Sequence, residues 1–270
     1  IIKDIKEDLG QMLLIGFDGK ELTPQLEVLV RKIKPGGILL LGRNIENKDQ
    51  LKKLIDDLQN VAASAGDNQL FVAVDQEGET LSRIPWATNA VELREIGVNM
   101  NLAPVLDSRN KGDYLFERSF KDKNAFELGK IFIENHQEKG ILAVPKHFPG
   151  YDGVSFNPET GRIPEIAAMP DTSLFEKIFK ELEIPFVMVS HVIYKDFDSE
   201  PFPFSKKAKQ LAQKALGQNI LIMSDDVLSK SFLNTYTFEE IGRKALNGGI
   251  DMLILGGYPD AANVEKFYDA

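Results

Sequence analysis

The sequence contains no cysteine, which excludes disulfide bonds, thiolate catalysis and zinc sites built from cysteine. It has no apolar run of the ~20 residues that a membrane-spanning helix needs. No segment concentrates lysine or arginine, and the 270 residues carry a formal net charge of −9. Nucleic acids and anionic membranes are therefore not expected as partners.

Motifs that would indicate a cofactor or a metal are also missing. There is no HExxH pair of histidines for zinc, no GxGxxG or Walker pattern for phosphates and no GxSxG turn for a catalytic serine. We expect neither metal nor cofactor. The composition is that of an ordinary globular protein, with 43% hydrophobic and 27% charged residues. An α/β barrel needs about 250 residues, so we expect one domain over residues 1–270.

Eight short apolar runs alternate with longer segments of helical period. The runs are largely apolar at both alternating positions, which is typical of parallel strands buried on both faces. They are Met12–Phe17, Gly37–Leu41, Leu70–Val74, Met100–Leu106, Ile141–Pro145, Phe186–Val189, Asn219–Met223 and Met252–Leu255. Between them, segments such as Lys48–Ser64 and Asn124–Lys139 place apolar residues three and four positions apart. This alternation predicts a (β/α)8 barrel of the TIM type, with an open doubly wound sheet as the alternative.

The predicted barrel is irregular at one point. The interval from Leu81 to Asn99 has few residues for a full crossover helix before the next strand. Only Ala90–Ile96 has room for helix there, and it gives two turns at most. We therefore expect a shortened crossover between the third and fourth strands.

Ionisable residues follow five of the apolar runs. In a barrel the carboxyl ends of the strands converge on one face, where active sites are built. The residues are Asp75 with Glu77, Asp107, Lys146 with His147, His191, and Asp225 with Asp226. A lone aspartate at a strand end commonly caps the next helix, so Asp225 and Asp226 also have a structural interpretation. The third histidine, His136, lies within a helical segment and is expected at the surface.

The expected site combines carboxylates with lysine, arginine and histidine donors. Carboxylates accept hydroxyl protons, and the basic groups donate to hydroxyl oxygens. A carboxylate can also attack an anomeric carbon. These residue types therefore favour a neutral, polyhydroxylated ligand.

An ordered set of motifs resembles glycoside hydrolase family 3, in its bacterial β-N-acetylhexosaminidase branch. The resemblance covers nearly the whole chain. Its motifs are Val74-Asp75-Gln76-Glu77-Gly78 with Arg83, Ala103-Pro104-Val105-Leu106-Asp107, Glu117-Arg118-Ser119-Phe120, Lys146-His147-Phe148-Pro149-Gly150, Ser190-His191-Val192-Ile193-Tyr194 and Ser224-Asp225-Asp226. Each motif alone is weak, but KHFPG and the shared order are specific.

The resemblance implies a retaining exo-β-N-acetylglucosaminidase that acts on peptidoglycan or chitin fragments. Asp225 would be the nucleophile that forms a covalent glycosyl-enzyme. His191 would line the site near the N-acetyl group. The hydroxyls of the terminal sugar would be held by Asp75, Arg83, Arg118, Lys146 and His147.

The sequence departs from this branch at the general acid/base. In the branch, KHFPG is followed by HGxxxxDSH or a close variant, whose last histidine is the acid/base. Here no histidine occurs between His147 and His191. Asp152 and Glu159 are the only carboxylates in the corresponding loop, and either could protonate the leaving group if burial raised its pKa.

Three explanations of this departure stay open. In the first, the chain uses Glu159, Asp152 or another carboxylate as acid/base. In the second, it accepts only substrates with good leaving groups. In the third, it binds sugar without turnover. A family 3 β-glucosidase is a further alternative, although most of these enzymes take their acid from a second domain, for which this length has no room. We expect a monomer with a small carbohydrate substrate, in the cytoplasm because no export signal is visible, with secretion or a lipid anchor as alternatives.

Overall fold

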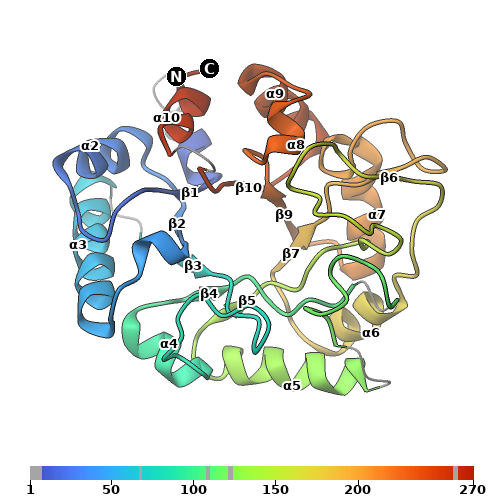
Figure 1. The fold of residues 1–270 in the computed structure, drawn as a ribbon, viewed down its shortest axis with the longest axis horizontal. Helices are drawn as coiled ribbons and strands as arrows, with labels where there is room; N and C mark the ends of the chain where they lie inside the picture. Colours follow the sequence, from blue (N-terminus) through green and yellow to red (C-terminus); the bar gives the residue numbers. More distant parts are fainter. Residues whose placement is uncertain (1–7, 67–68, 108–109, 121–123, 258–260) are drawn as a thin grey trace.

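The computed structural model describes residues 8–66, 69–107, 110–120, 124–257 and 261–270. Figure 1 looks down a ring of strands that is surrounded by helices. The main sheet has eight parallel strands in the order β5-β4-β3-β2-β1-β10-β9-β7. Their bounds are β1 Leu13–Gly16, β2 Gly37–Leu40, β3 Phe71–Val74, β4 Met100–Asn101, β5 Leu142–Ala143, β7 Phe186–Val189, β9 Leu221–Asp226 and β10 Met252–Leu255.

The two ends of this sheet meet. Beyond β5, Phe148 forms a parallel bridge with Val189 of β7. The backbone N–H of Met188 also donates to the carbonyl of Pro145 at 3.0 Å. An open doubly wound sheet leaves two free edges, whereas here the last strands pair with one another. The predicted (β/α)8 barrel is therefore confirmed.

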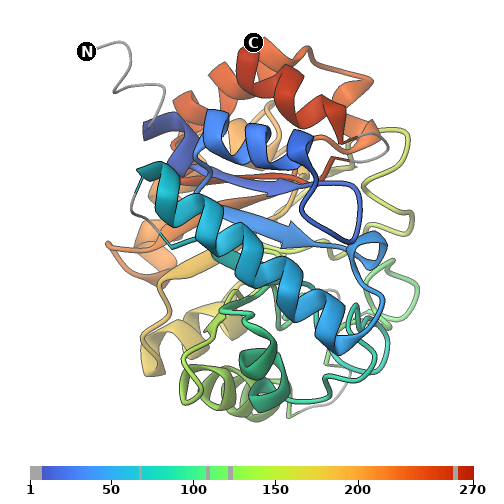
Figure 2. The same cartoon turned by 90° about the vertical axis from the view of Figure 1, so that its left-hand side faces the viewer.

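Helices cover the outside of the ring, and Figure 2 shows α2 and α3 lying across the strands. Their bounds are α2 Pro24–Ile33, α3 Lys48–Gly66, α4 Ala90–Ile96, α5 Ala125–Gln137, α6 Ser173–Glu181, α7 Lys206–Leu216, α8 Lys230–Leu233, α9 Phe238–Gly248 and α10 Ala262–Asp269. Side-chain caps define where several of them begin. The Ser205 side chain accepts from the backbone N–H of Lys207, and Thr237 forms a capping box with Glu240. The shortened crossover is confirmed, because α4 has only 7 residues.

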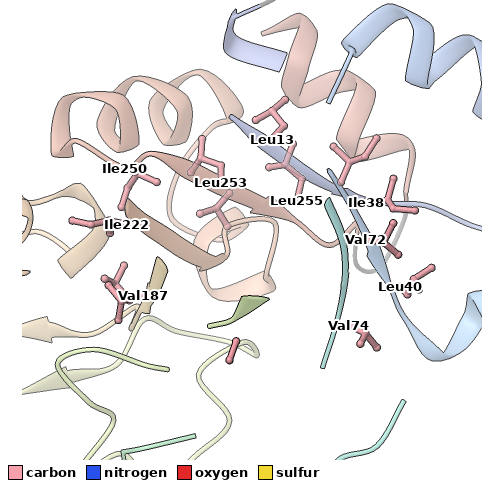
Figure 3. Close-up of a cluster of buried hydrophobic side chains, with 14 of the residues drawn as sticks. Leu13, Ile38, Leu40, Val72, Val74, Val187, Ile222, Ile250, Leu253 and Leu255 are labelled. Carbon is pink, nitrogen blue, oxygen red and sulfur yellow. The ribbon is translucent and has the colours of Figure 1, made fainter. Parts of the chain in front are cut away.

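Strand side chains alternate between two buried layers. The outward layer packs against the helices, and Figure 3 shows Leu13, Ile38, Val72, Val187 and Leu253 among its members. The inward layer fills the barrel with side chains such as Leu14, Leu39, Ala73, Met188 and Ile254. Both alternating positions are thus buried, which explains why the runs are continuously apolar. Because these side chains fill the interior, the barrel is closed below the carboxyl ends of its strands.

His136 does not lie at the surface, so that expectation was wrong. Its side chain is buried between α5 and the barrel, with its ring stacked on Phe132 at 4.2 Å between centroids. One ring nitrogen lies 3.0 Å from the Nδ2 of Asn101 in β4. Burial lowers the pKa of His136, which keeps the ring neutral. A helical period alone does not show that this polar residue faces the core.

The observed strands differ from the predicted runs in length and in number. β9 continues through Asp226, so Ser224, Asp225 and Asp226 lie in the strand and not after it. Two short strands outside the barrel, β6 (Glu165–Ile166) and β8 (Ile193–Tyr194), pair in parallel and were not predicted. Over the part of the chain that the structure describes, no helix is long and apolar enough to cross a membrane.

Candidate active site

A pocket of about 570 Å³ opens at the carboxyl ends of the strands. Leu39, Met188 and Ile254 of the inward layer form its floor. Of the residues that the sequence predicts for the site, seven line this one pocket: Asp75, Arg83, Arg118, Lys146, His147, Glu159 and Asp225. Residues from distant parts of the sequence meet here because parallel strands deliver their carboxyl ends to the same face.

Two predicted site residues lie elsewhere. Asp152 does not line the pocket, and its Oδ1 is 3.4 Å from the Nδ2 of Asn110. His191 was expected to line the site, but its ring is buried, does not line the pocket and lies edge-on to Phe232 at 4.3 Å between centroids. His191 interacts electrostatically with Asp225 from this buried position. In this structure His191 is a neighbour of Asp225 and does not line the pocket.

Both oxygens of Asp225 are held at the end of β9. The backbone N–H of Asp226 donates to Oδ1 at 2.8 Å, and the Tyr151 hydroxyl donates to Oδ2 at 3.3 Å. The Nε2 of His147 lies 3.8 Å from the same Oδ2. The Asp225 side chain is only 15% exposed, so its ionised form depends on these neighbours.

Burial alone would raise the pKa of Asp225. The His191 and His147 rings, the backbone N–H of Asp226 and the Lys146 ammonium outweigh burial and hold this pKa below its ordinary value. Burial lowers the pKa of His191 itself to about 4, so that ring is neutral at neutral pH. The Asp226 N–H and the Lys146 charge are among the contacts that keep Asp225 ionised there.

His147 is oriented by Asp107, a carboxylate at a strand end for which no role was predicted. The Nδ1 of His147 lies 3.2 Å from the Oδ2 of Asp107. The same Asp107 oxygen accepts from the backbone N–H of Tyr151 at 3.1 Å. Asp107 follows a predicted strand, and this position was the available signal. Its partner could not be read from the sequence, because 40 residues separate Asp107 from His147.

Glu77 connects the basic residues of the pocket, and this role also went unrecognised. The Lys146 Nζ lies 2.7 Å from Asp75 Oδ1 and 2.7 Å from Glu77 Oε1. Arg118 donates two bonds to Glu77, from Nε at 2.8 Å and from Nη2 at 2.6 Å. Burial would raise the pKa of Glu77, but the Lys146 charge and the Arg118 bonds lower it to about 2. Glu77 therefore neutralises and positions two predicted sugar-binding residues.

Removing the Glu77 charge should destabilise the protein. Glu77→Gln leaves Lys146 and Arg118 buried with one carboxylate fewer, and breaking a buried ion pair costs about 3 kcal/mol. Glu46→Gln is the matched control, because its pair with Lys20 is exposed and such pairs contribute at most about 1 kcal/mol. The free energies of unfolding follow from urea denaturation at neutral pH, where Glu77 is ionised. Equal losses in the two variants would contradict the structural role of Glu77.

The segment after Gly150 contributes Tyr151, Asn157, Pro158 and Glu159 to the lining of the pocket and is attached at two points. On one side the backbone N–H of Tyr114 donates to the carbonyl of Val154 at 2.7 Å. On the other side the Ser231 N–H donates to the Glu159 carbonyl at 3.3 Å, and Asn234 donates to the Gly161 carbonyl at 2.9 Å. Ser231 and Asn234 follow β9, the strand that carries Asp225. These contacts place Glu159 on the same pocket as Asp225.

The Glu159 carboxyl has the environment of a proton donor. Glu159 is an exposed residue that lines the pocket, where desolvation and the nearby charges of Asp225, Asp226 and Asp75 raise its pKa to about 7. Among the described residues, none donates a hydrogen bond to this carboxyl. Asp226 also has a pKa raised to about 7 by burial, but its Oδ1 accepts the N–H groups of Leu228 and Gly256. Asp226 therefore has a structural role, but it does not cap the next helix as suggested, because the N-cap of α8 is Ser229.

Known proteins resemble this chain over most of its length. The family model described as "Glycosyl hydrolase family 3 N terminal domain" matches residues 84–266. A Beta-hexosaminidase of Haemophilus influenzae is 30% identical over 279 residues, which cover 90% of this chain and 78% of that protein.

Two solved structures share the fold. NagZ from Neisseria gonorrhoeae aligns with a TM-score of 0.81 at 24% identity, over 96% of this chain and 84% of that one. A family 3 β-N-acetylglucosaminidase from Paenibacillus sp. str. FPU-7 aligns with a TM-score of 0.85 at 24% identity. The alignment covers 93% of this chain, which spans only 54% of the Paenibacillus enzyme. The family model and the Haemophilus relative together show that the chain belongs to glycosyl hydrolase family 3.

Proposed function

We propose that this protein is a retaining exo-β-N-acetylglucosaminidase in which Asp225 is the nucleophile and Glu159 the acid/base. The observation that carries the proposal is a pair of carboxyl groups on one pocket whose pKa values are shifted in opposite directions. The pKa of Asp225 is lowered, and that of Glu159 is raised to about 7. Such a pair divides the work of a glycosidase between an ionised nucleophile and a protonated acid.

In the first step, Asp225 attacks the anomeric carbon. A bond forms between that carbon and a carboxylate oxygen, the glycosidic C–O bond breaks, and the leaving oxygen takes the proton of Glu159. In the second step, Glu159 removes a proton from water, which attacks the same carbon and releases Asp225. Glu159 begins the next cycle protonated again. Neither of these two reaction steps uses a metal or a cofactor.

The basic residues of the pocket would bind the terminal sugar. Lys146, Arg118 and Arg83 line the pocket beside Asp75 and His147, so donors and acceptors for several hydroxyls converge there. The floor of inward-facing side chains closes the pocket below, which suits the end of a chain and not its middle. Hydrogen bonds to hydroxyls that strengthen in the transition state would add to the rate.

The choice of N-acetylglucosamine rests on the relatives, which include proteins named Beta-hexosaminidase at 30% identity. Peptidoglycan and chitin fragments are the natural substrates that we propose. The expectation of a cytoplasmic monomer stays a prediction.

Rates on two aryl substrates would test the proposal. We expect turnover of an aryl N-acetyl-β-glucosaminide well above that of the matching β-glucoside, with the β-anomer as the first product in NMR spectra. A preference for the glucoside would favour the β-glucosidase alternative. Binding of N-acetylglucosamine without cleavage of either substrate would favour the sugar-binding alternative, and an α-anomeric first product would contradict a covalent intermediate.

A further inference from the structure

Tyr151 lies at the point where the related branch has a histidine after KHFPG. Its side chain is 1% exposed although it borders the pocket. The backbone N–H of Tyr151 donates to Asp107, and its ring packs edge-on against His147 at 5.0 Å between centroids. Neighbours on both sides therefore fix the ring, and with it the position of the hydroxyl.

The direction of the hydroxyl proton follows from the hydrogen bonds. The Tyr151 oxygen accepts the backbone N–H of His191 at 2.9 Å. An N–H can only donate, so the single hydroxyl proton is left for the other neighbour, Asp225 Oδ2 at 3.3 Å. Burial and the Asp225 charge raise the pKa of Tyr151 well above 10, so the proton stays on the hydroxyl. The donor is thus present whenever Asp225 is ionised.

We propose that Tyr151 is the positioning residue of the nucleophile, whose hydroxyl holds Oδ2 of Asp225 while the Asp226 N–H holds Oδ1. The inference rests on the proposed role of Asp225. Two donors on the two oxygens prevent the carboxylate from rotating about its Cβ–Cγ bond. Tyr151 also stabilises the ionised form, which has to be populated before attack.

The charged and titratable groups around Asp225 come from several elements. Asp225 has Asp226 as its neighbour in β9. It also interacts electrostatically with five groups outside β9, namely His147, His191, Lys146, Arg118 and Glu159. Tyr151→Phe removes none of these groups and deletes one oxygen atom. A change in the ionisation of Asp225 in this variant therefore reports on the hydroxyl.

Tyr194→Phe is a matched control. Tyr194 is equally buried, and its hydroxyl is 2.6 Å from both the Ser190 Oγ and the Gly150 carbonyl oxygen. Its hydroxyl donates to the Gly150 carbonyl and not to Asp225, and Tyr194 does not line the pocket. Both substitutions leave a buried backbone or side-chain group without its hydrogen-bond partner, so they should lower the melting temperature by similar amounts. Only the change at Tyr151 should alter the nucleophile.

The test measures kcat and KM on an aryl N-acetyl-β-glucosaminide, whose good leaving group makes the rate less dependent on Glu159. In Tyr151→Phe we expect kcat to fall about tenfold with KM within about twofold of the wild-type value, as for a lost hydrogen bond to a charged group. The acidic limb of the kcat/KM profile should move to higher pH by about one unit, because Asp225 is harder to ionise. Tyr194→Phe should leave that limb in place.

An acidic limb that stays in place in Tyr151→Phe, with kcat no lower than in Tyr194→Phe, would overturn the role of Tyr151. Asp225→Ala is assayed alongside to separate this result from a failure of the proposed function. Turnover in Asp225→Ala would overturn the nucleophile itself. An inactive Asp225→Ala together with an unmoved limb in Tyr151→Phe would overturn only the positioning role.

Discussion

Asp225→Ala should lose turnover by about 10⁴-fold or more on both aryl and disaccharide substrates, because no covalent intermediate can form without the carboxylate. The loss affects kcat, since the sugar-binding residues around Lys146 and Arg118 remain. The protein should stay folded, because the Asp225 side chain contributes no apolar packing and its strand is held by parallel neighbours on both sides. Steady-state kinetics and circular dichroism of the purified variant provide the measurement.

Added azide makes the test of Asp225 more specific. Once the carboxylate is gone, the small anion can occupy its place and attack the anomeric carbon from the same face, with loss of the aryl leaving group. A single displacement inverts the configuration, so the expected product is the α-glycosyl azide. Asp225→Asn serves as the control of similar size that keeps the space filled. A near wild-type rate in Asp225→Ala without azide would contradict the assignment.

Glu159→Gln should have the second largest effect, and the size of that effect should depend on the leaving group. General acid catalysis contributes about 10²–10⁴-fold, so the rate on an unactivated disaccharide should fall by about that factor. An aryl leaving group needs little protonation, so its release should be impaired less. Comparing kcat/KM for the two substrates in wild type and variant provides the measurement.

The pH dependence follows from the raised pKa of Glu159. Its carboxyl has to be protonated to act as acid, so the wild-type kcat/KM on the disaccharide should decline as the pH rises through about 7. Glutamine does not titrate, so this basic limb should disappear from the remaining activity of Glu159→Gln. A limb that persists unchanged in the variant would show that another group donates the proton.

Asp152→Asn is the matched control for Glu159. Both residues are carboxylates of the same loop, and both were candidates for the acid/base, but only Glu159 lines the pocket. Asp152→Asn should therefore keep close to the wild-type rate on the disaccharide. A larger loss in Asp152→Asn than in Glu159→Gln would transfer the acid/base role to Asp152.

Much of the barrel follows from local patterns along the chain. Lys48–Ser64 was predicted as a helix and is observed as Lys48–Gly66, because its apolar face repeats every three to four residues over five turns. The eight strands were predicted because a strand between helices and a filled interior is apolar on both faces. Strand limits were less predictable: the apolar run Met100–Leu106 contains only Met100–Asn101 as strand. After Asn101 the chain no longer pairs regularly with the neighbouring strands. The apolar composition of the run does not show where this strand ends.

The position of polar residues relative to the sheet was predictable, but their partners were not. A carboxylate at a strand end signals the active face, and seven predicted residues indeed line one pocket. Which carboxylate neutralises Lys146, however, depends on the distance between side chains of different strands. Asp75 and Glu77 are two residues apart, and both contact Lys146. Their spacing in the sequence does not show which of the two carboxylates pairs with this lysine.

The amino-acid sequence alone predicted the alternation of strands and helices, the family and the residue expected to attack the sugar, because these depend on local periodicity and on ordered motifs. It left Glu159 and Asp152 equivalent, because both are carboxylates in the same loop. Their difference arises only when the loop attaches to the segment after β9, which places Glu159 on the pocket that Asp225 lines, where its pKa is raised to about 7. The same holds for His136 and His191, whose burial is set by packing between elements distant in the chain. Ionisation depends on the surroundings of a group, and those surroundings come from the whole fold.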